Sequence, residues 1–238
     1  MGQKFERIKK RNILNSIIYK VACLNWFSNK NKFEFFANLE WIFHVLAHES
    51  WMNEYLDSKE HPSREFLFNF IRDKVPTDAR IMDLGCGNGE ISACLGQISN
   101  SVIGVDKDPK KIRNAQVKYK SENVKFICSD ALNYLQNCPD KFDVLFLSHI
   151  LEHLDEPIKF LNDFKSEFRY IYIEVPDFEN SYINIVRKRF NCYLNYADED
   201  HIHEFDREEM ISIIMSINGE ILNAEYRNGV MRFWIRVN

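Results

Sequence analysis

The chain has 238 residues, of which 45% are hydrophobic and 28% are charged. This length suits one α/β domain with an extension, and the hydrophobic content is sufficient for a sizeable core. The formal net charge is −4, although residues 1–32 carry eight basic side chains and only one acidic side chain. The remaining, acidic part lacks the basic surface that binds phosphate backbones, which argues against a nucleic-acid partner.

The six cysteines are scattered, and no two of them form a Cys-x-x-Cys pair. This pattern argues against a disulfide framework or a thiolate metal site and favours a reducing compartment. No apolar run reaches the roughly 18 residues of a membrane span, and the charged start of the chain does not resemble a signal peptide. We therefore expect a cytoplasmic protein.

The first predicted element is a basic amphipathic helix within residues 4–24, whose apolar side chains recur at helical spacing. Lys and Arg beside an apolar helix face are attracted to anionic lipid, which would place the protein at the inner face of the membrane. Docking onto a partner protein or onto a second copy is an equal alternative. The oligomeric state therefore stays open.

A second helix is expected over residues 33–56. Its apolar face comprises Leu39, Ile42, Phe43, Leu46 and Ala47. Residues 1–61 together form an N-terminal helical extension, which we expect either to close over the ligands as a lid or to pack its aromatic side chains on the sheet.

From Pro62 onward, helix and strand patterns alternate. A helix begins at Pro62 and ends before Pro76. Strands are then expected at residues 80–84, 101–105, 123–128, 142–147 and 170–175, and helices at 89–98, 109–120, 130–137 and 156–168. This alternation predicts βαβ units and a parallel sheet with helices on both faces.

The C-terminal part has a different pattern. A helix over residues 207–217 ends at Gly219. Strand-like segments at 221–226 and 230–237 then flank Asn228-Gly229, which is a strong signal for a tight hairpin. We therefore predict one domain over residues 62–238, of the α/β class, with a mostly parallel Rossmann-like sheet and an antiparallel C-terminal hairpin.

The most specific motif is the glycine-rich turn in residues 81–90, Ile-Met-Asp-Leu-Gly-Cys-Gly-Asn-Gly-Glu. Glycines between a strand and a helix allow close backbone approach to a ligand. Asp106 follows Gly87 by 19 residues, near the offset expected of a ribose-binding acid. The third glycine comes one residue too early for a dinucleotide fingerprint, and Asp83 disfavours a phosphate. A ligand that bears an amine fits better.

Residues 83–89 are similar to motif I of the class I S-adenosylmethionine-dependent methyltransferases, and the resemblance extends over roughly residues 62–238. It implies a seven-stranded sheet, S-adenosyl-L-methionine as cofactor and S-adenosyl-L-homocysteine as product. Asp83 would help to anchor the methionine amino group. The turn positions that would bind the cofactor are Leu84, Gly85, Cys86 and Gly87.

The resemblance implies further cofactor contacts. Asp106, with Lys107 next to it, would accept hydrogen bonds from the ribose hydroxyls. Asp130 would receive the adenine amine, and the backbone of Ala131 would reach the adenine ring. Apart from the resemblance, Arg64 in the predicted helix after Pro62 is a further candidate, which could reach the cofactor carboxylate. For Asp130, a helix N-cap is an alternative role.

Residues 148–154, Ser-His-Ile-Leu-Glu-His-Leu, resemble the segment that follows the fourth strand in this superfamily. Ser148 and His149 would lie at the methyl end of the cofactor. His153 could be a core histidine, a base that faces the substrate, or a metal ligand together with Glu152. In ubiquinone-pathway O-methyltransferases a related segment binds a divalent cation. Because His149 replaces one of the expected acids, we expect no metal here.

An acidic loop over residues 198–206 contains His201 and His203, directly before the predicted helix. An imidazole near acids titrates around neutral pH and suits removal of a hydroxyl proton, so both are candidate catalytic residues with His149 and His153. The alternative for His203 is a packing role next to the helix start at Asp206.

The whole pattern resembles bacterial methyltransferases of surface-glycan or sugar biosynthesis, from Asn38-Leu39-Glu40-Trp41 through Ile173-Glu174-Val175-Pro176-Asp177 to Phe233-Trp234. Our leading hypothesis is therefore methylation of a sugar hydroxyl. A small metabolite or a quinone-like acceptor is the alternative. A catalytically inactive scaffold with the same fold is a third hypothesis. The intact acids at positions 83, 106 and 130 argue against it.

Overall fold

The computed structural model describes residues 28–55, 62–138, 140–190 and 200–237, with isolated positions between residues 17 and 23. The predicted basic helix therefore lies almost entirely outside the described residues, as do His61, Asp198 and Glu199. The boundary between extension and domain also falls at the edge of the described part and stays a prediction.

Seven strands form one sheet in the order β3-β2-β1-β4-β5-β7-β6. The first five strands are parallel, and β7 is antiparallel to both β5 and β6. The strands are β1 Arg80–Leu84, β2 Ser101–Asp106, β3 Val124–Cys128, β4 Val144–Ser148, β5 Tyr170–Pro176, β6 Glu220–Arg227 and β7 Val230–Arg236. The predicted α/β fold with its C-terminal hairpin is confirmed. At the hairpin turn, Asn228 and Gly229 have φ of 56° and 81°, as a tight turn requires.

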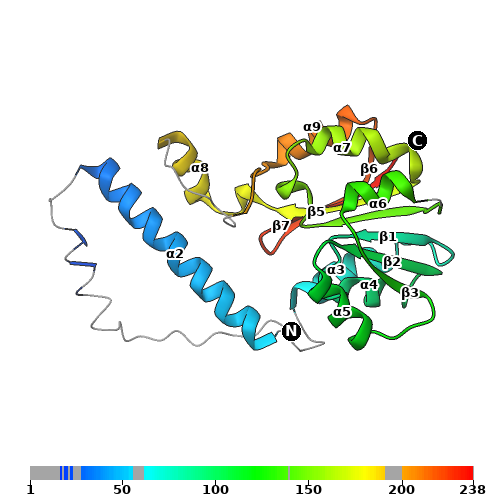
Figure 1. Ribbon diagram of the computed structural model, residues 1–238. Helices are drawn as coiled ribbons and strands as arrows, with labels where there is room; N and C mark the ends of the chain where they lie inside the picture. The colour runs from blue at the N-terminus through cyan, green and yellow to red at the C-terminus, as the bar shows by residue number, and fades with distance from the viewer. Residues whose placement is uncertain are drawn as a thin grey trace, which may run out of the picture.

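Helices cover both faces of this sheet (Figure 1). One face carries α3 Pro62–Ile71, α4 Glu90–Leu95 and α5 Pro109–Lys118, and the other carries α6 Ala131–Asn137, α7 Pro157–Phe164 and α9 Arg207–Ser216. Short 3-10 turns are η1 Leu151–His153, η2 Lys165–Glu167 and η3 Phe178–Asn180. The helix expected at 156–168 therefore ends earlier, and its last residues form η2.

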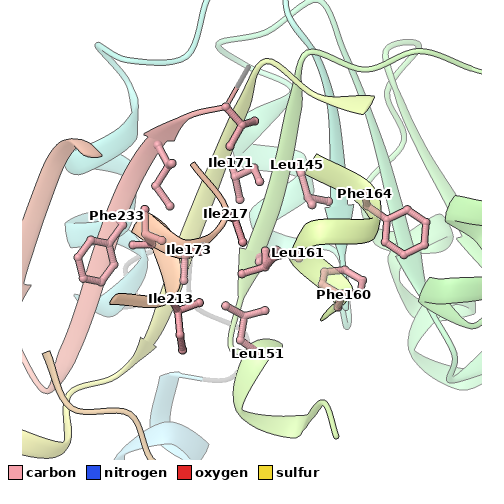
Figure 2. Close-up of a cluster of buried hydrophobic side chains, with 14 of the residues drawn as sticks. Leu145, Leu151, Phe160, Leu161, Phe164, Ile171, Ile173, Ile213, Ile217 and Phe233 are labelled. Carbon is pink, nitrogen blue, oxygen red and sulfur yellow. The ribbon is translucent and has the colours of Figure 1, made fainter. Parts of the chain in front are cut away.

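The core lies on both faces because side chains alternate along the central strands. Leu145 and Ile171 pair in register and pack against Leu161 of α7 on one face (Figure 2). Phe146 and Tyr172 point to the other face, where their rings stack at 4.1 Å. Each such burial contributes about 1.5–3 kcal/mol, so the two-sided core fixes the register of β4 and β5.

Helix α2, Asn29–Tyr55, stands away from the sheet and lies next to α8, Tyr182–Phe190 (Figure 1). One link between them is Arg187 of α8, whose buried guanidinium donates to the Ala37 carbonyl and, at 2.8 Å, to Glu40. No helix was predicted between the strand at residues 170–175 and the loop at 198–206, so α8 is an addition from the structure.

The expected packing of α2 on the sheet is wrong for much of its apolar face. Phe43 is 65% exposed and Leu46 is 52% exposed, and Ile42 is also exposed. His44 and His48 lie on the surface as well. The physical reason is that α2 packs on α8, and the sheet faces are already covered by other helices.

The strand order changes direction between β1 and β4, next to the centre of the sheet. The chain passes from β1 outward to β2 and β3, then returns to β4 on the other side of β1. Open α/β sheets bind ligands at such a switch point, at the carboxyl ends of the strands. Within the described part of the chain, no helix is long and apolar enough to cross a membrane.

Candidate functional site

The glycine-rich turn connects β1 to α4 as predicted. Gly85, Gly87 and Gly89 have positive φ of 69°, 55° and 84°, a region that other residues rarely adopt. The amides of Gly85 and Cys86 both donate to the Val105 carbonyl, which ties the turn to β2. A side chain at Gly87 would meet nothing within 4 Å. The backbone of the turn is thus open to a ligand at this position.

Asp106 is oriented by backbone N–H groups. One carboxylate oxygen accepts from Gly87 at 2.9 Å, and the other accepts from Asp108 at 2.8 Å. Each carboxylate oxygen has two lone pairs, so both oxygens can accept a further hydrogen bond. The carboxylate therefore stands at the end of β2 in a fixed direction, as a contact to two adjacent hydroxyls requires.

Asp83 is almost completely buried at the end of β1, where Ser92 of α4 donates to it at 2.5 Å. Burial raises the pKa of Asp83 to about 7; the Ser92 hydrogen bond lowers it and the charge of Asp106 raises it. A buried carboxylate without a cation is costly. An ammonium group at this position would stabilise the ionised form, which fits the predicted amine-bearing ligand.

The other predicted cofactor residues occupy different environments. The Asp130 carboxylate accepts from Asn133 at 3.0 Å and caps α6, so the alternative role as N-cap is confirmed, and Ala131 begins that helix. Lys107 is exposed after β2. Arg64 of α3 lies 3.9 Å from Glu90, next to the glycine turn.

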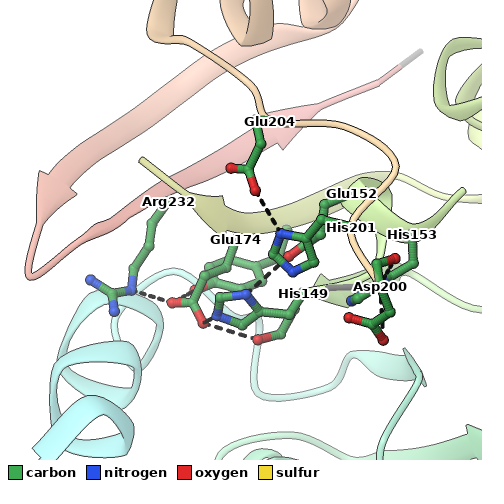
Figure 3. A network of polar contacts seen from close by, with 10 residues as sticks. His149, Glu152, His153, Glu174, Asp200, His201, Glu204 and Arg232 are labelled. Atoms are coloured by element: carbon green, nitrogen blue, oxygen red, sulfur yellow. Dashed lines mark hydrogen bonds and ion pairs between the residues drawn. The ribbon is translucent and has the colours of Figure 1, made fainter. Parts of the chain in front are cut away.

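The carboxyl ends of β4 and β5 carry a network of charged side chains (Figure 3). His149 follows β4 with φ of 55°, and its Nδ1 and Nε2 lie 3.0 Å from Glu152 and 3.6 Å from Glu174. Partial burial lowers the pKa of His149, but the two carboxylates outweigh this effect and raise the pKa above its usual value. The two carboxylates thus favour the protonated form of His149.

Glu174 connects this network to β7. It faces Arg232 in the antiparallel register, and the two buried side chains form an ion pair. Ser148 and Tyr172 also donate to Glu174, at 2.9 Å and 3.0 Å. Burial and the nearby carboxylate raise the pKa of Tyr172 well above its usual value, so its hydroxyl stays protonated.

The loop before α9 meets the segment after β4. The amides of Ile202 and His203 both donate to the Glu152 carbonyl, at 2.8 Å and 3.1 Å. The rings of His153 and His201 meet edge to face with centroids 4.8 Å apart. His203 instead stacks on Phe205, and its buried Nε2 has no hydrogen-bond partner among the described residues.

The structure therefore brings the segments that carry His149, His153, His201 and His203 into one region. Their catalytic role stays a prediction. The structure also adds Glu174, Glu204 and Arg232, which were not predicted as site residues. The only signal for Glu174 and Arg232 in the sequence is one charge inside each of two apolar strands. Pairing those charges requires the β5–β7 register.

Comparison with known proteins agrees with this geometry. The sequence profile of the family described as "Methyltransferase domain" matches residues 77–226. A curated relative, ubiquinone biosynthesis O-methyltransferase of Pseudomonas fluorescens, is 28% identical over 120 residues, which cover 48% of this chain and 51% of the relative. The chain thus spans about half the length of the curated relatives it matches.

Solved structures with low sequence identity share the fold. A SAM-dependent methyltransferase from Archaeoglobus fulgidus has a TM-score of 0.56 and 20% identity, and the match covers 79% of this chain and 99% of the other. Magnesium protoporphyrin IX methyltransferase from Synechocystis, with bound SAH, has a TM-score of 0.55 and 14% identity, with 95% and 96% covered. With the family profile covering more than half of the chain, this protein belongs to the class I S-adenosylmethionine-dependent methyltransferases.

Proposed function

We propose that this protein transfers the methyl group of S-adenosylmethionine to a hydroxyl group of a small molecule. The observation that carries the proposal is the charged network around His149 at the ends of β4 and β5, next to the glycine turn on β1. Methyl transfer needs mainly proximity and orientation, because the sulfonium is already reactive. A hydroxyl acceptor must also lose a proton, which imidazole and carboxylate groups can take up.

On the cofactor side, we assign Asp83 to the ammonium group and Asp106 to the ribose hydroxyls. The support is the burial of Asp83, which forms no ion pair with the described residues, and the fixed direction of the Asp106 carboxylate. Asp130 and Ala131 would face the adenine from the start of α6. The roles of Arg64 and Lys107 stay predictions.

On the acceptor side, the four histidines would have different roles. Both ring nitrogens of His149 face carboxylates, so neither nitrogen is directed at an acceptor hydroxyl. We assign it to positioning at the methyl end of the cofactor, with Ser148. We assign proton removal to His203, because its buried Nε2 lacks a partner in the described part of the chain.

The chemical class of the acceptor is a separate proposal. The name of the curated relatives supports a quinone-like hydroxyl compound. The resemblance to surface-glycan methyltransferases supports a sugar hydroxyl. Buried Asp83 argues against an inactive scaffold, because a buried carboxylate is costly unless a ligand supplies a cation. Asp106 points the same way, whereas Asp130 also caps α6 and carries less weight.

Calorimetric titration of the full chain with S-adenosylhomocysteine tests the proposal. We expect binding, and we expect Asp106→Ala to weaken it at least about tenfold, because hydrogen bonds to a charged group contribute about 1.5–3 kcal/mol. Asp163→Ala, which removes an exposed acid of α7, is the matched control and should bind normally. An intact protein that binds no S-adenosylhomocysteine contradicts the proposal.

Turnover experiments then separate the acceptor classes. Methyl transfer from labelled S-adenosylmethionine would be measured with dihydroxyphenyl compounds and, in parallel, with nucleotide sugars. His203→Ala should lower kcat at least about a hundredfold while S-adenosylhomocysteine binds unchanged, since general-base catalysis contributes about 10²–10⁴. His44→Ala on α2 is the control. Equal turnover in both variants would remove His203 from the mechanism.

A further inference from the structure

Three potential metal ligands converge where the loop before α9 meets η1. Glu152, His153 and His201 each offer one ligand atom, and these atoms all lie within 4.8 Å of one another. Figure 3 shows the two imidazoles and the carboxylate turned toward one region. Two of the ligands are adjacent in η1, and the third comes from a loop almost 50 residues later.

The carboxylate of Glu152 is incompletely satisfied. The residue is fully buried, and its Oε1 contacts His149 at 3.0 Å. Its Oε2 has no hydrogen-bond partner among the residues that the structure describes. A buried carboxylate oxygen without a partner is costly, and a bound cation would remove that cost.

Both imidazoles have an outer partner of the kind that supports metal ligands. His153 Nδ1 lies 3.2 Å from the carbonyl of Asp200, and His201 Nδ1 lies 3.1 Å from the carboxylate of Glu204. When Nδ1 donates to such an oxygen, the other ring nitrogen keeps its lone pair, which is the form that binds a metal.

The backbone already holds the two ligand segments together. The amides of Ile202 and His203, next to His201, donate to the carbonyl of Glu152. The side chains are therefore placed before any ion binds. Zinc takes nitrogen and oxygen ligands at about 2.0–2.2 Å, so an ion would draw the three atoms closer than they lie now.

We propose that Glu152, His153 and His201 bind one divalent transition-metal ion of the zinc type. Imidazole ligands favour such ions over magnesium or calcium, which prefer oxygen. This proposal differs from the expectation of no metal, which relied on His149 in place of an acid. Here His149 contacts only Oε1 of Glu152, and His201 supplies the third potential ligand.

The ion would have room for a further ligand, because three protein groups leave a coordination position open. In this part the inference rests on the proposed function: a hydroxyl of the acceptor would bind there. Coordination to a divalent ion lowers the pKa of an oxygen nucleophile. Metal binding itself can be measured without any acceptor.

The test uses the full chain, freed of metal with a chelator and titrated with Co²⁺ and Zn²⁺ alone. We expect one equivalent of Zn²⁺ by calorimetry, a visible Co²⁺ absorption that Zn²⁺ abolishes, and a higher Tm with Zn²⁺. His201→Asn and Glu152→Gln should each weaken Zn²⁺ binding at least about tenfold. The control His44→Ala changes an exposed histidine of α2 and should bind like the parent.

The readouts separate this inference from the proposed function. If the protein binds S-adenosylhomocysteine but takes up no Zn²⁺, the metal site is wrong and the methyltransferase proposal stands. Zn²⁺ binding that is equally tight in His201→Asn and in His44→Ala would also overturn the site. If Glu152→Gln does not fold, the Zn²⁺ titration of His201→Asn and the Tm shift of the parent protein test the metal site.

Discussion

The two halves of the site differ in what builds them. At the ends of β1 and β2, backbone groups of a short loop orient the proposed cofactor contacts; the amide of Gly87, for example, donates to Asp106. At the ends of β4 and β5, charged side chains orient one another, and Arg232 reaches Glu174 from 58 residues away. The first half, which backbone groups orient, can therefore be predicted from a local motif. The second half, which charged side chains orient, depends on how the strands of the whole sheet are paired.

The largest loss of stability should follow from breaking the ion pair between Arg232 and Glu174 in the second half. Arg232→Met leaves Glu174 buried without its cation, which costs about 3–5 kcal/mol in free energy of unfolding. Urea unfolding followed by circular dichroism measures it. The double variant Arg232→Met with Glu174→Gln should recover part of the loss. A single variant as stable as the parent would show that the charges of this half are not coupled.

The first half should respond to pH through Asp83. Its raised pKa stabilises the ligand-free protein at low pH; this contribution is complete below the ordinary value of 3.8 and is lost as the pH rises through about 7. The loss is of the order of 2–4 kcal/mol, and Asp83→Asn should abolish it. Affinity for S-adenosylhomocysteine should fall in the opposite direction, as the pH drops below about 7. Urea unfolding and calorimetry between pH 5 and 8 check both slopes; parallel profiles for parent and variant contradict the assignment.

The glycine turn gives a comparison within the first half. Gly89→Ala combines positive φ with a Cβ only 2.6 Å from the ring of Phe126, whereas Gly87→Ala has positive φ and open space. Left-handed strain alone costs about 1–2 kcal/mol. We expect Gly89→Ala to destabilise clearly more than Gly87→Ala in thermal unfolding. An equal loss of stability in both variants would mean that Phe126 and its neighbours move to accommodate the added Cβ.

The smallest effect should lie outside both halves, on α2. Phe43→Ser removes an exposed side chain and should change the free energy of unfolding by less than about 0.5 kcal/mol. Leu161→Ala, in the core beneath α7, should cost about 2–5 kcal/mol in the same assay. A large loss from Phe43→Ser would show that another surface covers this face in solution.

The strands, their order of alternation and the hairpin were predictable because each depends on local pattern. Residues 102–105 are apolar and lie between polar Ser101 and Asp106, which predicts a strand. Asn228-Gly229 strongly favours a tight hairpin turn. The surroundings of α2 were not predictable. Its apolar face resembles a core-facing helix, and whether it meets the sheet depends on where α8 lies.

The sequence by itself determined the cofactor half, since residues 83–89 and Asp106 lie close in the chain and their backbone geometry follows from glycine. Only the tertiary structure shows which side chains the histidines contact. His149, Glu152 and His201 become one network because parallel strands bring their ends together and the loop before α9 hydrogen-bonds to η1. Such contacts depend on distance in space, which a linear pattern does not record.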